Sequence, residues 1–225
     1  MDGRAPEGHY PAVMLADWLS PRPRPDVHDA HLGKHPCVGT GTALDIVPLL
    51  TWEALGRLLA SDLPCDVLTS SGGRPVNVPR PTGLGQVRAL LRRGIGVVVQ
   101  GSERHDPGLA WLAESFGRSQ AGEVQVQLHA TPAGPCGGGW SCSSEDLFIA
   151  QTAGIADHHF REAGARGTPR VLGRDRSLVF SSRLEPGDWL FVPARWWHLV
   201  RCTEEALSIS VSVTPPPLMD GWPPS

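Results

Sequence analysis

The side chains that could do chemistry fall in two stretches of the chain. GPCGGGWSCSSEDLFIAQTAG (134–154) carries hydroxyls at Ser141 and Ser143, and LEPGDWLFVPARWWHLV (184–200) carries the imidazole of His198. Two histidines and one carboxylate on one face of the metal form the Fe(II) site of many oxygenases. If His198 is such a ligand, we expect its partners to lie near Ser141. None of the nine histidines is followed two places later by Asp or Glu, so no His-x-Asp pair is available.

A second metal arrangement is also open. His129 lies on the polar side of the alternating segment EVQVQLHA, whose other side is Val124, Val126 and Leu128. Together with His198 it could hold a metal, helped by Cys142 or Glu145. The alternative is a metal-free His198 that is simply hydrogen-bonded inside the fold.

Further candidates concern the lining of a ligand site. Trp140, Trp196 and Trp197 could form an aromatic wall for a ligand, or they could fill the core. For the adjacent pair His158 and His159 we expect an exposed turn at the rim of the site.

Composition excludes several classes of partner. The chain has 225 residues and a net charge of −3, with a pI of about 6.3. It has no dominant basic patch, which argues against nucleic acid as a partner. It also lacks the ~18-residue apolar run of a membrane span, and its N-terminus does not resemble a signal peptide. The five cysteines are odd in number and form no CxxC, so we expect reduced thiols and a cytoplasmic location.

The first half of the chain predicts helices with some strand. Thr51 can cap a helix over LLTWEALGRLLAS, and PTGLGQVRALLRRG shows the same helical spacing, with Gly94 placed to end it. Asp106 followed by Pro107 begins a third helix, which we expect to stop at Gly117. The segment IGVVVQG predicts a short apolar strand.

From residue 123 onward the pattern is that of short strands separated by Gly/Pro turns, which is typical of a sandwich or barrel. We therefore predict a mainly β protein with α-helices (α+β), built as a double-stranded β-helix, or jelly roll, with flanking N-terminal helices. The expected divisions are an extended arm (1–35), a helical and mixed front half (36–122), the double-stranded β-helix (123–215) and a Pro-rich tail (216–225).

The order of these motifs resembles the JmjC-type cupins, specifically the bacterial and eukaryotic ribosomal protein hydroxylases that use Fe(II) and 2-oxoglutarate. The resemblance runs from about residue 32 to 215 and rests on LGKHPCV, GIGVVVQGSERHDPGLAWLAESFG, VQLHATPAGPCGGGWSCSSEDLFIAQTAG and LEPGDWLFVPARWWHLV. It implies a cupin fold in which His198 is the distal metal ligand.

The resemblance also shows what has changed. In a gapless match, the family's His-x-Asp falls on Ser141 and Ser143, and the cation that anchors 2-oxoglutarate falls on Ala156. The family's Tyr-x-Thr-Pro begins here with His129. A neutral hydroxyl is a poor Fe(II) ligand and does not balance the metal's charge.

Three functional hypotheses follow. The first is a pseudoenzyme, or repurposed pocket, that binds a peptide, protein or small molecule in the barrel mouth and needs no cofactor. The second is an active Fe(II)/2-oxoglutarate hydroxylase with unusual ligands, and the third is a metal-independent biosynthetic enzyme on the same scaffold. Long members of the family continue into a helical dimerisation segment and a winged-helix domain, which we expect to be absent after Ser225. The oligomeric state is left open.

Overall fold

The computed structural model describes residues 35–61, 64–119, 123–134, 139–161 and 180–214. Its helical elements all lie before residue 120: η1 (Leu44–Leu49), α3 (Trp52–Ala60), α4 (Leu84–Arg92), η2 (Ser102–Arg104) and α5 (Pro107–Ser119). The strands are β1 (Cys37–Gly39), β2 (Asp66–Ser71), β3 (Arg74–Pro75), β4 (Gly96–Gln100), β5 (Glu123–Thr131), β6 (Ser141–Cys142), β7 (Asp146–Ala153), β8 (Ala156–Arg161), β9 (Phe180–Leu184), β10 (Trp189–Val192), β11 (Trp197–Cys202) and β12 (Ala206–Thr214). The expected arm and tail lie outside the described residues, apart from His35.

Local signals explain where the helices begin. The Thr51 hydroxyl accepts a hydrogen bond from the Ala54 amide at the start of α3. The Asp106 carboxylate accepts from the amides of Gly108 and Leu109 at the start of α5. Side-chain oxygens at these positions satisfy amides that a helix leaves unpaired in its first turn. Both predicted caps are confirmed.

The helices end for a different reason. Gly94 takes the left-handed conformation (φ 72°), and the next amide bonds back to Leu90, which closes α4 as expected. Gly117 does not adopt a positive φ, and α5 continues to Ser119. The prediction that α5 stops at Gly117 is therefore wrong by two residues, because a glycine ends a helix only where it adopts that conformation.

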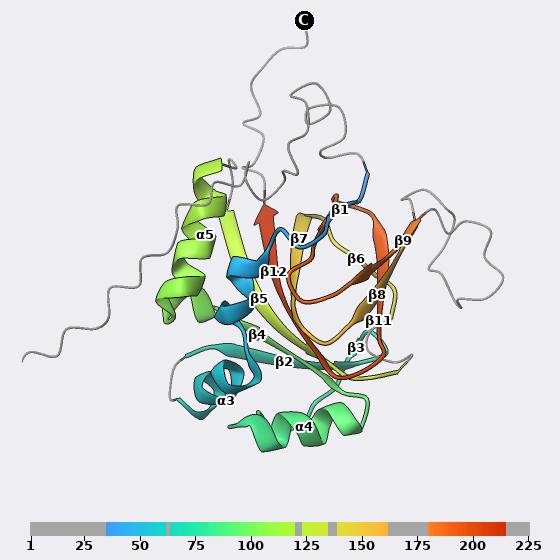
Figure 1. The fold of residues 1–225 in the computed structure, drawn as a ribbon. Helices are drawn as coiled ribbons and strands as arrows, with labels where there is room; N and C mark the ends of the chain where they lie inside the picture. The colour runs from blue at the N-terminus through green and yellow to red at the C-terminus, as the bar shows by residue number, and fades with distance from the viewer. Residues whose placement is uncertain (1–34, 62–63, 120–122, 135–138, 162–179, 215–225) are drawn as a thin grey trace, which may run out of the picture.

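Two sheets face each other, and the helices cover the outer side of the larger one (Figure 1). The larger sheet has the order β1-β10-β7-β12-β5-β4-β2-β3, and the smaller one has the order β6-β11-β8-β9. The main core lies between α3, α4, α5 and one side of the large sheet, where Leu128, Ile209 and Val211 are buried. This is the double-stranded β-helix with flanking helices that the strand pattern predicted.

The opposite side of the large sheet packs on the small sheet. Ile149, Leu190 and Val192 of the large sheet form one buried cluster with Phe160 and Leu184 of the small sheet. Because side chains alternate between the two faces of a strand, this cluster identifies which residues of every neighbouring strand point between the sheets. We call the space between the two sheets the barrel interior.

Candidate functional site

His198 lies second in β11, between β6 and β8. It is in register with Ser141 on one side and with Phe160 on the other, so all three share the face turned to the barrel interior. The Ser141 hydroxyl lies 2.9 Å from His198 Nε2, within hydrogen-bond distance. The structure thus brings together two candidates that are 57 residues apart in the chain.

Ser143 is placed differently. It follows β6 rather than extending it, and its hydroxyl accepts a hydrogen bond from the Glu145 amide at 2.9 Å. Its carbonyl accepts from the Arg195 amide at 2.7 Å, where Arg195 has a positive φ of 67°. The Ser143 side chain is therefore engaged in the turn that leads into β7.

His129 reaches the barrel interior from the large sheet. Its Nε2 lies 2.8 Å from the hydroxyl of Ser210 on β12. Burial lowers the pKa of His129 to about 4, and the charge that His198 would carry acts in the same direction. Burial also lowers the pKa of His198 to about 4. Both rings are therefore neutral near pH 7, because the low-dielectric interior disfavours the charged form.

The expectation that His158 lies in an exposed turn is wrong. His158 lies within β8, in register with Val200 of β11 and Ser182 of β9, and is 2% exposed. Neither of its ring nitrogens has a hydrogen-bond partner. Burial lowers its pKa to about 3, again with a contribution from the charge of His198. The segment ADHHF carries no alternating apolar signal, so nothing in the sequence indicated that His158 lies inside the fold. Its burial follows from the pairing of β8 with β9 and β11 and from the packing of the large sheet on the small one.

The remaining candidates lie around this interior. Cys142 and Trp197 are in register with each other and occupy the face of the small sheet turned away from His198. Glu145 accepts a hydrogen bond from the Thr214 hydroxyl at 2.7 Å. Trp140 is half-buried, and its indole nitrogen has no partner.

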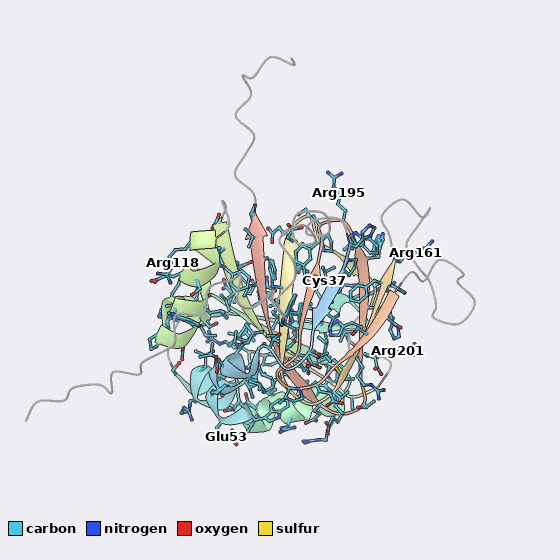
Figure 2. The ribbon with its side chains drawn as sticks, turned by 45° about the horizontal axis from the view of Figure 1, so that its top comes forward. Cys37, Glu53, Arg118, Arg161, Arg195 and Arg201 are labelled. Atoms are coloured by element: carbon cyan, nitrogen blue, oxygen red, sulfur yellow. The ribbon has the colours of Figure 1, made fainter. Side chains whose placement is uncertain are left out.

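Ala156 is 2% exposed and faces the interior in register with Cys202. It therefore occupies the inner face without supplying a charge. The nearest cations on this sheet point elsewhere, as Arg201 alternates to the outer face opposite Asp157. Figure 2 shows the side chains of Arg195 and Arg201 at the periphery of the molecule.

These residues do not fit an iron and 2-oxoglutarate site. An Fe(II) triad needs a carboxylate to balance the metal's charge, whereas His198 faces the neutral hydroxyl of Ser141. Within the described residues, no group of three His, Cys, Asp or Glu side chains is arranged to hold a metal ion. No helix in the same part of the chain is long and apolar enough to cross a membrane.

Comparisons with known proteins agree with this architecture. The profile of the JmjC domain matches residues 109–220. A crystal structure of the Escherichia coli ribosomal oxygenase YcfD aligns with a TM-score of 0.63 at 20% identity, covering 88% of this chain and 53% of YcfD. A structure of YcfD in complex with cobalt and 2-oxoglutarate aligns with a TM-score of 0.62 at 19% identity, covering 86% and 52%.

The chain thus spans about half the length of the YcfD structures that it matches. The comparison with curated proteins found no match. At this level of identity the structural likeness establishes the fold. The profile match and the arrangement of the two sheets together show that the chain carries a JmjC domain and has the fold of a JmjC-type cupin.

Proposed function

We propose that this JmjC-type domain binds a ligand in its barrel interior without iron and 2-oxoglutarate chemistry. The observation that carries the proposal is the 2.9 Å contact between the Ser141 hydroxyl and His198 Nε2. The imidazole nitrogen that faces Ser141 is satisfied by a neutral protein group. The hydroxyl of Ser143, the other position that the resemblance assigns to a ligand, is used by the Glu145 amide.

Electrostatics support the same conclusion. A related fold, that of YcfD, has been seen with cobalt and 2-oxoglutarate. To hold such a doubly charged cation and dianion, the barrel interior would need charged groups of its own. Instead, the small sheet presents Ser141, His198 and Ala156 on its inner face, with the imidazole held neutral by burial.

The proposed ligand is a peptide, protein or small molecule that enters at the mouth of the barrel. We place the protein in the cytoplasm, where reduced cysteines are the rule. Cys37, Cys65, Cys142 and Cys202 are free thiols, which supports this part of the proposal.

A metal-independent enzyme is the second candidate, and the same contact favours it. A serine hydroxyl within hydrogen-bond distance of an imidazole is the first element of a nucleophile–base pair. The base should in turn be oriented by a third group, typically an acid, but the described residues place no acidic side chain on the His198 ring, which interacts with the backbone of Trp196 instead. The low pKa of His198 also makes it a weak base. Binding is therefore the better supported function.

Metal content and cosubstrate turnover test the proposal. Protein purified without a tag should contain no stoichiometric iron, and calorimetry with Fe(II) under argon should show no micromolar binding. Adding 2-oxoglutarate and Fe(II) in air should cause no oxygen consumption above that of buffer. YcfD treated in the same way is the positive control. Micromolar Fe(II) affinity together with oxygen consumption that depends on 2-oxoglutarate would overturn the proposal.

A further inference from the structure

The inner face of the small sheet is uncharged wherever the structure describes it. On β8 the inward positions are Ala156, His158 and Phe160, and on β11 they are His198, Val200 and Cys202. The charged residues of these strands, such as Asp157 and Arg201, take the alternate positions and face outward. A ligand that contacts this face meets apolar groups and imidazoles.

His158 is the unsatisfied group on this face. It is 2% exposed, and both ring nitrogens lack a hydrogen-bond partner. A neutral imidazole has one N–H donor and one acceptor nitrogen. Buried polar groups are hydrogen-bonded in the great majority of proteins, and an unpaired one calls for a partner. The ring stacks on Phe160 with 6.3 Å between centroids, so it has a packed neighbour but no polar one.

The opposing sheet offers matching chemistry. Ser208, Ser210 and Ser212 alternate with the buried residues Ile209 and Val211, which places the three hydroxyls on the side facing the small sheet. The Ser210 hydroxyl already lies within hydrogen-bond distance of His129 Nε2. Ser212 is 2% exposed, and its hydroxyl has no partner. A hydroxyl, like a neutral imidazole, both donates and accepts.

We propose that the barrel interior recognises an uncharged group that both donates and accepts hydrogen bonds, of which a primary carboxamide is the simplest, and that His158 is its main contact. This inference rests on the proposed binding function. A carboxylate only accepts, so it would leave the acceptor nitrogen of His158 unpaired and would be buried without a cation. An ammonium group only donates and would be buried without an anion. A carboxamide can donate to or accept from whichever ring nitrogen faces it, in either tautomer, and it loses less hydration free energy than either charged group.

The test compares two amides with their matched acids. Succinamide against succinate represents a free small molecule. N-acetyl-glutamine methylamide against N-acetyl-glutamate methylamide represents a peptide side chain. Binding is measured by ligand-observed NMR saturation transfer and by the ring 15N shifts of His158 in histidine-labelled protein. We expect an amide to bind about tenfold or more tightly than its acid, since an unpaired buried group costs that much. The pair with the stronger preference identifies the source of the ligand.

Two variants give the contacts a matched control. His158→Phe keeps the ring and its packing but removes both nitrogens, so amide binding should weaken about tenfold while Tm stays equal or rises. His159→Phe changes the next residue of the same strand, on the outer face, and should leave amide binding unchanged.

Each outcome decides the inference. Amide binding that is lost in His158→Phe and kept in His159→Phe supports it. Equal or tighter binding of the acids overturns it, as does amide binding that His158→Phe leaves intact, because the nitrogens would then be satisfied by buried water only. Absence of binding by both amides at millimolar concentration also overturns it. None of these results bears on metal uptake, which tests the proposed function separately on the same protein.

Discussion

Lowering the pH should destabilise the fold through His158. Burial is the main cause of its low pKa of about 3, the charges of His198 and His159 add to it, and Asp157 partly opposes it. In the unfolded chain a histidine has a pKa of about 6.5. Below that value His158 binds a proton in the unfolded state but stays neutral in the folded state. The free energy of unfolding therefore falls as the pH drops from about 6.5 toward the folded pKa.

The size of the effect follows from these two values. Between pH 7 and pH 5 the contribution of His158 alone is about 2 kcal/mol, because the folded ring stays neutral at pH 5 while the unfolded one is almost fully charged. That is a large part of the ~5–15 kcal/mol by which domains are stable. The half-buried His129 and His198 should add in the same direction by smaller amounts.

The His158→Phe variant isolates this contribution. Urea unfolding followed by tryptophan fluorescence at pH 7, 6 and 5 gives the free energy of unfolding of both proteins. The wild type should lose about 2 kcal/mol more than the variant between pH 7 and pH 5. Titration of carboxylates and of the other histidines is common to both proteins and largely cancels. If both proteins lose stability equally, His158 titrates normally and its burial as described is refuted.

Three further predictions concern the neighbourhood of Ser141. Ser141→His with Ser143→Asp should create Co(II) or Ni(II) binding, visible as metal absorbance, which requires the new aspartate at position 143 to turn from the Glu145 amide toward His198. Binding of 2-oxoglutarate, measured by calorimetry, should still require Ala156→Arg. A folded double variant that takes up no metal would show that position 143 stays in its turn or that the register is wrong. Gly73→Ala places a Cβ 2.9 Å from a backbone atom of the segment before β6, whereas Gly72→Ala, at a residue that also has a positive φ, meets open space. Gly73→Ala should therefore lower the free energy of unfolding by about 1–3 kcal/mol more than Gly72→Ala. Equal losses in urea unfolding would show that this contact is unimportant. A fluorophosphonate should not label Ser141 in intact-protein mass spectrometry, because its histidine partner lacks an orienting acid; rapid labelling would favour the metal-independent enzyme.

Much of the fold follows from signals within single segments. Thr51 and Asp106 begin helices because their side-chain oxygens satisfy nearby amides, and Gly94 ends one because it tolerates a positive φ. The alternation in 123–130 identifies β5, and its apolar side does face the helices. These features depend on neighbours a few residues away, so the sequence is enough to predict them.

The strands without an internal pattern could not be predicted in this way. The segment DVLTSS (66–71) has no alternation of apolar and polar residues and so predicts no strand by itself, yet it forms β2 because β4 pairs with it on one side and β3 on the other. Strand pairing of this kind joins residues that are distant in the chain, and its hydrogen bonds leave no local trace in side-chain polarity.

The candidate site shows the same division. The sequence alone indicated that hydroxyls stand at Ser141 and Ser143 and that His198 has no His-x-Asp partner, because residue types and spacing are enough for that. Only the packing of the two sheets determined that Ser141 meets His198, that Ser143 is held in a turn, and that His158 is buried with both ring nitrogens unpaired. The environment of a polar side chain depends on which strand lies opposite, and that is decided when the β-strands pair.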